Sequence, residues 1–138
     1  MKILFMCVAN SVRSQIAEGL ARKIWGSEVE IESAGSFPSK VNPYVIKVLE
    51  EVGIDASDHY SKSVEDLSRE FILNIDYVIT LCAEEVCPTI ISKAKKIHWP
   101  QSDPATIFGS EVEKLKRFRA VRDNIQKKLE QFKEEILG

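Results

Sequence analysis

Residues 2–25 read KILFMCVANSVRSQIAEGLARKIW, and this stretch determines the fold that we predict for the chain. After its leading lysine, the run at residues 2–6 is continuously apolar, as in a parallel strand that is covered on both faces. From Ser14 to Trp25, apolar side chains recur at three- and four-residue steps, which predicts a helix that Gly26 ends. The segment from Cys7 to Arg13 is therefore predicted to be the turn between a buried strand and a helix.

The rest of the chain continues this alternation of strands and helices. Three further strands are predicted, at residues 29–35, 76–81 and 96–99. Two further helices are predicted, one from Pro43 to the Gly53 that ends it and one over residues 110–137. The pattern predicts an α/β fold in three layers, α/β/α, around a four-stranded parallel sheet.

Three residues with reactive side chains each follow a predicted strand: Cys7, Cys82 and Asp103. In a parallel sheet, ligands bind beyond the carboxyl ends of the strands. We therefore expect these three side chains at one edge of the sheet.

The composition limits the possible functions. The 138 residues suit one domain, and no repeat or linker divides residues 1–138. A net charge of -2 gives no basic surface for nucleic acid or anionic membrane, and the apolar runs are too short to span a bilayer. No signal peptide is recognisable, so we expect the protein in the cytoplasm. From its charge and short apolar runs we expect that it binds neither nucleic acid nor membrane, and we also expect a monomer. The odd number of cysteines argues against a disulfide framework, leaving burial, metal ligation or redox chemistry.

The turn after the first strand has the composition of an anion-binding loop. Most of the residues between Cys7 and Arg13 are small, so their N–H groups can form a nest for a tetrahedral oxyanion at the helix N-terminus. Arg13 can clamp two oxygens of the anion, and such surroundings favour a reactive Cys7 thiolate to which Ser14 donates a hydrogen bond. The oxyanion is expected to bind to Val8, Ala9, Asn10, Ser11, Val12, Arg13 and Ser14. The alternative is a buried cysteine beside an unrelated arginine. A nucleotide-binding loop is excluded, because neither Gly-Lys-Ser/Thr nor Gly-x-Gly-x-x-Gly is present.

The motif Cys-x5-Arg-Ser, here CVANSVRS at residues 7–14, resembles a loop shared by two groups of enzymes. They are the low-molecular-weight protein tyrosine phosphatases and the thioredoxin-coupled arsenate reductases built on the same fold. Further strings are more similar to the reductases: SQIAEGLA, SAG followed by NP, EEVGID, VITLC and HWPQSDPA. The resemblance covers the whole chain and implies the low-molecular-weight phosphatase fold and chemistry that needs no metal or organic cofactor.

Cys82 and Cys87, in TLCAEEVCP, correspond in this resemblance to the two further cysteines of the reductases. Reducing arsenate takes two electrons, which thiols supply by forming a disulfide, whereas phosphoryl transfer needs one cysteine. On a regular helix, residues five apart have Cα atoms roughly 8–9 Å from each other, beyond the ~7 Å that a disulfide tolerates. We therefore hypothesise that oxidation reshapes residues 82 to about 92. A core thiol at Cys82, or a zinc pair, are the alternatives.

Asp103, in SDPA, matches the general acid of both groups, which protonates the departing oxygen. From the dipeptide alone, a plain Asp-Pro turn is the alternative. In the phosphatases one or two tyrosines follow this Asp-Pro, whereas residues 105–108 here read ATIF, which weakens the phosphatase interpretation.

The resemblance also implies a group of residues that supports the loop. Asn10 and Ser33 correspond to a pair that braces it, and Asn10, Glu18 and Ser33 correspond to a potassium site of some reductases. A further aspartate of that site is replaced by Lys62, whose ammonium can stand where the cation would. We therefore expect activity that does not depend on potassium; a solvated surface lysine is the alternative.

The sequence thus predicts an arsenate reductase that is regenerated by thioredoxin. The resemblance implies that Cys7 attacks arsenic while Asp103 protonates the leaving hydroxide. Cys82 then attacks the Cys7 sulfur and arsenite leaves, and Cys87 attacks Cys82 to move the disulfide to the Cys82–Cys87 pair, where thioredoxin reduces it. The runner-up is a phosphatase for phosphotyrosine or another phosphomonoester that uses Cys7, Arg13 and Asp103, and the non-enzymatic alternative is an oxyanion-binding sensor.

Overall fold

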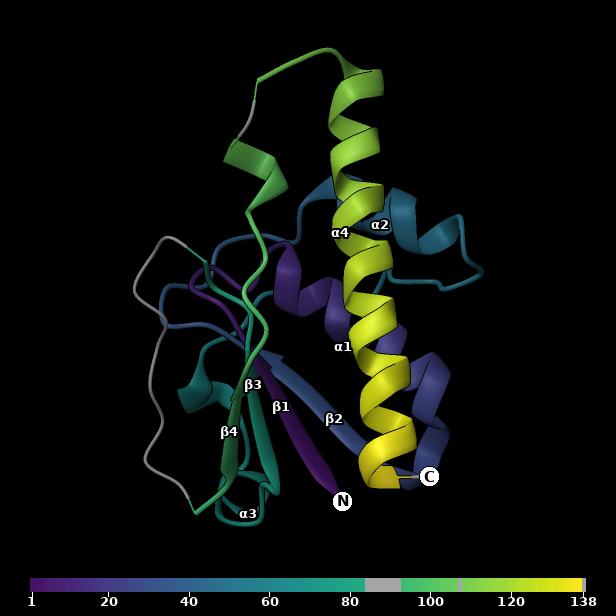
Figure 1. Ribbon diagram of the computed structural model, residues 1–138. Coiled ribbons are helices and arrows are strands. Elements are labelled where there is room, and N and C mark those ends of the chain that lie inside the picture. Colours follow the sequence, from purple (N-terminus) through teal and green to yellow (C-terminus); the bar gives the residue numbers. More distant parts are fainter. Residues whose placement is uncertain (84–92, 107, 138) are drawn as a thin grey trace.

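A computed structural model describes residues 1–83, 93–106 and 108–137. Its four strands are β1 (Lys2–Met6), β2 (Glu30–Ala34), β3 (Tyr77–Thr80) and β4 (Lys95–His98). They form one parallel sheet in the order β2-β1-β3-β4 (Figure 1). All four predicted strands are confirmed, each within one residue of its predicted ends, and β1 lies inside the sheet as its apolar sequence indicated.

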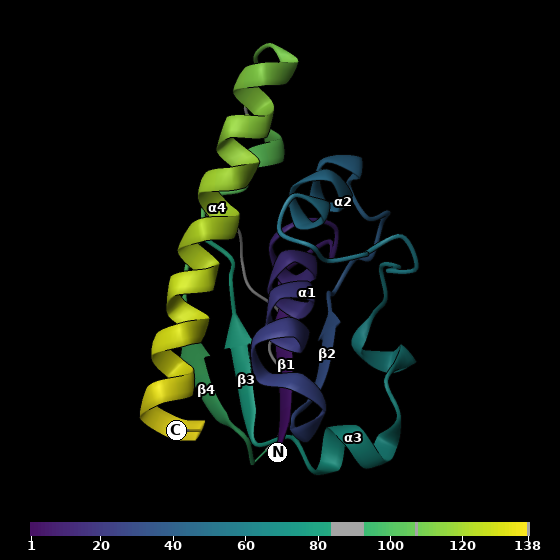
Figure 2. The same cartoon turned by 90° about the vertical axis from the view of Figure 1, so that its right-hand side faces the viewer.

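The helices of the described chain are α1 (Arg13–Trp25), α2 (Pro43–Glu50), α3 (Arg69–Leu73) and α4 (Glu111–Phe132). Four short segments complete them: the 3-10 turns η1 (Gly26–Glu28), η2 (Val64–Asp66) and η3 (Pro104–Thr106), and a π-helical end, η4 (Lys133–Leu137). Figure 2 shows α1 and α4 side by side across one face of the sheet, with α2 beyond its carboxyl edge. None of these helices combines the length and apolar character needed to cross a bilayer.

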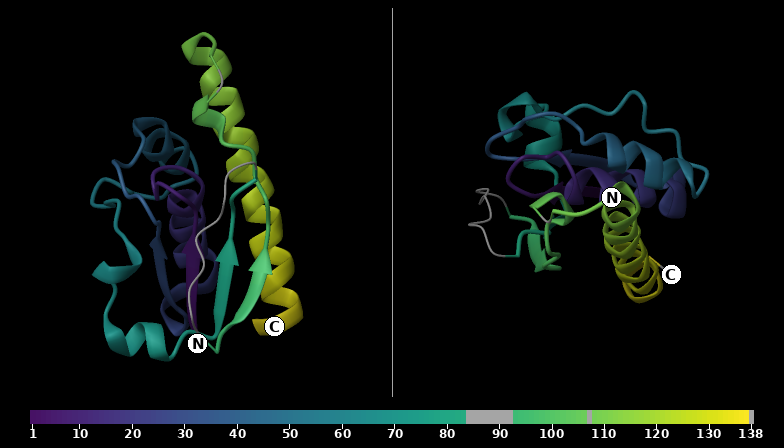
Figure 3. Two further views of the ribbon diagram at one scale, coloured as in Figure 1. Left: turned by 90° about the vertical axis from the view of Figure 1, so that its left-hand side faces the viewer. Right: turned by 90° about the horizontal axis from the view of Figure 1, so that it is seen from above.

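The side chains of β1 alternate between two hydrophobic clusters. Ile3 and Phe5 pack into the larger cluster with α1, α2 and α4, while Leu4 and Met6 pack into a second cluster on the opposite face. The second cluster includes Phe71 of α3, which lies near the amino ends of the strands (Figure 3). The predicted three-layer α/β/α arrangement is therefore confirmed.

The helix ends follow local sequence signals. Gly26 ends α1 with a φ of 68°. The side chain of Asn42 caps α2 by accepting from the N–H of Tyr44 at 2.9 Å. The predicted extent of this helix was too long, because it ends at Glu50 and a turn leads to Gly53, whose φ is 81°. η2 and α3 were not predicted, since segments of three and five residues are too short to show helical periodicity.

The carboxyl edge of the sheet holds Cys7 directly after β1 and Cys82 shortly after β3. The edge is tightly packed where β2 ends: a Cβ on Gly35 would lie 2.3 Å from the carbonyl oxygen of Val8 and 2.8 Å from that of Cys7. Gly35 also donates its N–H to the carbonyl of Lys62 at 3.0 Å, so it joins the Cys7 turn to the segment before η2. Only a residue without a side chain allows this approach.

We expect Gly35→Ala to push the turn after Cys7 out of place. The overpacking should lower the free energy of unfolding by about 2 kcal/mol, measured in urea. Displacement of the loop should also weaken phosphate binding about tenfold, measured by calorimetric titration. Gly26→Ala is the control, because a Cβ there meets no atom within 4 Å and the cost is confined to its φ of 68°. It should lose stability but bind phosphate normally; equal phosphate affinity for both variants would contradict the prediction.

Candidate active site

The turn from Cys7 to Ser14 directs its carbonyl groups outward. The carbonyls of Val8 and Ala9 accept from the N–H groups of Phe37 at 3.0 Å and Ser39 at 3.1 Å. The carbonyl of Asn10 accepts from the Ser61 hydroxyl at 2.7 Å, and that of Ser11 accepts from the N–H of Asn42 at 3.0 Å. Among the described residues, no hydrogen bond is donated by an N–H of residues 8–12. With the carbonyls bound by other segments, these N–H groups are available to a ligand, and successive available N–H groups in a turn are the arrangement that binds oxyanions.

Cys7 lies at the base of this turn, with its side chain buried. Its Sγ is 2.9 Å from the Ser14 hydroxyl. The amide nitrogen of Asn10 donates to that hydroxyl oxygen at 2.7 Å, so the hydroxyl hydrogen is available to donate to sulfur. A donor of this kind stabilises the thiolate more than the thiol.

Arg13 is the first residue of α1 and is 4% exposed. Its guanidinium donates to the carbonyl of Gln101 at 3.0 Å and to that of Leu81 at 3.5 Å. The other terminal nitrogen is 3.9 Å from a carboxylate oxygen of Asp103, which is partly exposed. The structure thus brings Arg13 and Asp103 together at the carboxyl edge of the sheet, the edge at which Cys7 follows β1. The second oxygen of Asp103 accepts from the N–H of Ala105 at 3.0 Å, so the carboxylate is held by its own turn.

Cys82 reaches the same edge from the neighbouring strand. The N–H of Leu81 donates to the carbonyl of Met6 at 2.9 Å, which continues the pairing of β3 with β1 up to these two cysteines. Cys82 is buried and disulfide-bonded, while the Cys7 thiol is free. Cys87, together with the segment to residue 92 for which we predicted a change on oxidation, lies outside the described residues.

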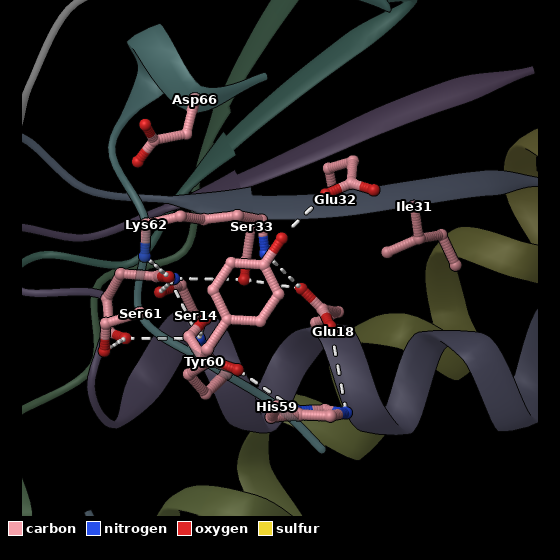
Figure 4. Close-up of polar contacts among 12 residues, drawn as sticks. Ser14, Glu18, Ile31, Glu32, Ser33, His59, Tyr60, Ser61, Lys62 and Asp66 are labelled. Carbon is pink, nitrogen blue, oxygen red and sulfur yellow. Dashed lines mark hydrogen bonds and ion pairs between the residues drawn. The ribbon is translucent and has the colours of Figure 1, made fainter. Parts of the chain in front are cut away.

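Behind the turn, a second group of polar side chains is buried between α1, β2 and residues 59–62 (Figure 4). The Asn10 amide donates to the Ser33 hydroxyl at 3.0 Å, and that hydroxyl donates to Glu18 at 2.6 Å. The Lys62 ammonium is 3.4 Å from the same Glu18 oxygen and 3.6 Å from a carboxylate oxygen of Glu32. Lys62 is only 6% exposed, so the alternative of a solvated surface lysine is wrong.

The residues at this position do not fit a bound potassium ion. Ser33 and Glu18 bond to each other directly, and Asn10 Oδ1 already accepts from the N–H of Lys62 at 3.0 Å. An added cation would also lie against the Lys62 ammonium. In the described ranges of the chain, no three or more His, Cys, Asp or Glu side chains converge as metal ligands either.

Sequence reasoning missed two members of this group, Gln15 and His59. The Gln15 amide donates to Asn10 Oδ1 and to the Tyr60 carbonyl, both at 2.9 Å, and its oxygen is 3.1 Å from His59 Nδ1. His59 Nε2 is 3.7 Å from Glu18. A signal for Gln15 was its position beside the apolar residues of α1, whereas His59 occupies a polar stretch without any pattern.

Comparison with known proteins agrees with this geometry. The family model for low molecular weight phosphotyrosine protein phosphatase matches residues 2–137. Arsenate reductases of Halalkalibacterium halodurans and Bacillus subtilis are 41% and 40% identical over 134 residues, which is 96% of this chain and 94% of each relative.

Solved structures of arsenate reductases are also similar to this chain. The structure of an arsenate reductase in the phosphate binding state has a TM-score of 0.78 at 30% identity, covering 98% of both chains. A thioredoxin-dependent arsenate reductase of Corynebacterium glutamicum has a TM-score of 0.74 at 31% identity, covering 99% of this chain and 61% of that one. The resemblance in the loop, the sheet order and the match along nearly the whole sequence lead to one conclusion: the chain belongs to the low molecular weight phosphotyrosine protein phosphatase family.

Proposed function

We propose that this protein reduces arsenate to arsenite with three cysteines and that thioredoxin regenerates it. The observation that carries the proposal is the second buried cysteine, Cys82, at the end of the strand next to that of Cys7. A phosphatase of this family needs only one thiol. The names of relatives about 40% identical over the whole chain support the same reaction.

In the first step, the oxyanion binds to the N–H groups of the turn and to Arg13. The Cys7 thiolate attacks arsenic, and an arsenic–oxygen bond breaks as Asp103 protonates the departing oxygen, which leaves as water. The product is arsenic(V) bound to the Cys7 sulfur. Ser14 stabilises the thiolate before this attack.

In the second step, the Cys82 thiolate attacks the Cys7 sulfur. The sulfur–arsenic bond breaks, and its electron pair stays on arsenic, which leaves as arsenite while the two sulfurs form a disulfide. Cys87 then attacks Cys82, freeing Cys7 and forming the Cys82–Cys87 disulfide that a dithiol of thioredoxin reduces. A state with Cys82 disulfide-bonded and Cys7 free matches the end of this sequence. All steps use cysteines of one chain, so we propose that the protein acts as a monomer. Because thioredoxin is the reducing partner, we propose that it acts in the cytoplasm.

Thioredoxin, thioredoxin reductase and NADPH provide the test of the cysteine relay. With arsenate, the wild type should consume NADPH over many turnovers, while Cys82→Ser should fall to background because the arsenic adduct on Cys7 cannot be resolved. Thr80→Ser, at the end of the same strand, is the control and should keep its rate. Hydrolysis of p-nitrophenyl phosphate by Cys82→Ser shows that the anion site is intact.

Two results would contradict the relay. Failure of the wild type to consume NADPH, with p-nitrophenyl phosphate hydrolysed, would make the protein a phosphatase. Phosphate binding without either reaction would make it an oxyanion sensor.

Asp103→Asn tests the proposed acid. The amide keeps the size of the side chain but has no proton to give to the leaving oxygen, so arsenate reduction should slow about 10²- to 10⁴-fold. Asp123→Asn, an exposed residue of α4 that pairs with Arg122, should not change the rate. An unchanged rate in Asp103→Asn would leave Asp103 as part of an ordinary turn.

A further inference from the structure

The reactive sulfur of Cys7 is connected to a buried ammonium through four side chains. The sequence of contacts runs from Cys7 to Ser14 at 2.9 Å, to Asn10 at 2.7 Å, to Ser33 at 3.0 Å, to Glu18 at 2.6 Å and to Lys62 at 3.4 Å. The first two contacts lie within the turn, and the other three join the turn to β2, β2 to α1, and α1 to the segment before η2. The position of Glu18 therefore affects the position of the group that faces the thiol.

The direction of these hydrogen bonds is fixed by the donors at both ends. Asn10 Oδ1 accepts from the backbone N–H of Lys62, which can only donate, so the Asn10 nitrogen must face the two hydroxyls. The Ser33 hydroxyl has one hydrogen and gives it to the Glu18 carboxylate, and the Ser14 hydroxyl is left to donate to sulfur. This directed arrangement requires the Glu18 carboxylate to stay in its present place as the acceptor for Ser33.

A buried carboxylate stays ionised only when nearby charge compensates for its lost hydration. The Glu18 carboxylate has three cationic or titratable neighbours: Lys62 at 3.4 Å, Arg22 at 3.5 Å and His59 at 3.7 Å. Arg22 is half exposed, with 51% of its side chain accessible, whereas the Lys62 side chain is 7% accessible. Solvent screens the charge of Arg22 more strongly, so the ammonium of Lys62 is the main compensating charge.

The surroundings of Lys62 favour a cation. A cavity of about 310 Å³ beside it is also lined by Glu32, Asp55 and Asp58, and Ser57 hydrogen bonds lower the pKa of Asp55. The Tyr60 ring lies over the ammonium, with its centroid 5.0 Å from Nζ, and Figure 4 shows this ring beside the Lys62 side chain. Removing the ammonium would leave an excess of carboxylates around Glu18.

We propose that Lys62 is a positioning residue for Cys7, acting as a cation built into the chain that holds Glu18 and, through Ser33 and Asn10, the Ser14 hydroxyl on the thiol. The inference rests on the proposed function only in taking Cys7 as the nucleophile. Lys62 touches neither substrate nor sulfur, and its effect is transmitted by the loop.

The rate of Cys7 alkylation by iodoacetamide, followed on the Cys7 peptide by mass spectrometry after reduction, tests this role without arsenate or thioredoxin. In Lys62→Met, which keeps the chain length and the backbone contacts, the rate at pH 6 should fall about five- to tenfold. At pH 10, where thiols are ionised in most surroundings, the rate should be close to that of the wild type. This pH dependence separates positioning of the thiolate from a general loss of structure.

Lys47→Met is a matched control. The Lys47 ammonium also contacts a glutamate, Glu111, at 3.2 Å and lies over a tyrosine ring, Tyr44, at 5.5 Å, but it is half exposed. Its alkylation profile should equal that of the wild type. Lys62→Gln loses the positive charge but keeps N–H donors for Glu18, so it should lower the rate at pH 6 in the same direction by a smaller factor, which provides a test if Lys62→Met does not fold.

Chemical rescue provides a second test. In Lys62→Ala, which leaves space beside Glu18, ammonium chloride should restore the alkylation rate at pH 6, while tetramethylammonium chloride at the same ionic strength should not. The wild type should react equally in sodium and potassium chloride, because Lys62 occupies the place of a bound cation. Normal alkylation of folded Lys62→Met at pH 6, absence of rescue by ammonium, or a wild type that responds to potassium would each overturn the proposal.

If the wild type does not reduce arsenate but Lys62→Met alkylates slowly at pH 6 and ammonium rescues Lys62→Ala, the proposed arsenate reduction is refuted and the positioning role of Lys62 stands. The reverse pattern, with arsenate reduced normally by Lys62→Met and alkylation unchanged, would refute the positioning role alone.

Discussion

The backbone of Asn10 adopts a positive φ of 50°, and the shape of the Cys7 turn depends on it. Asparagine tolerates this left-handed conformation better than most residues. Its fully buried amide makes four hydrogen bonds, giving two N–H groups to Ser14 and Ser33 and accepting from Gln15 and from the N–H of Lys62. Glycine would allow the backbone but make none of these bonds, and aspartate could not donate. One side chain thus joins the turn to α1, to β2 and to residues 60–62.

The turn is then held open by the rest of the chain. Its outward carbonyls are bound by residues 37–42 and by Ser61, segments that lie far from Cys7 in the sequence. Since buried carbonyl groups need donors, these segments keep the turn from collapsing onto its own N–H groups. The donors for an oxyanion are therefore oriented before it binds, which lowers the reorganisation needed for reaction.

The strands, the long helices and the motif at residues 7–14 could be predicted because each has a local pattern: an apolar run, a helical period or a cap such as Asn42. Glu18, Ser33 and Lys62 could be predicted only through the family resemblance, since nothing local marks them as neighbours. Gln15 had only a weak signal, a polar residue beside the apolar residues of α1, and His59 had none, because their roles come from the packing of residues 59–60 against α1. The five residues of α3 depend on the burial of Phe71 under the sheet, which is a tertiary effect.

A lysine and a free metal ion meet different requirements at the same place. A free ion must be drawn from solution, so its occupancy depends on concentration, and it needs several oxygen ligands at once. The Lys62 ammonium is present in every molecule and brings three N–H donors, for which the carboxylates of Glu18 and Glu32 and the face of Tyr60 are sufficient partners. The Ser33 hydroxyl donates to Glu18, and the Asn10 oxygen accepts from the Lys62 N–H, so neither is needed as a metal ligand. A single lysine thus allows the polar groups behind the loop to be used entirely for orienting Asn10.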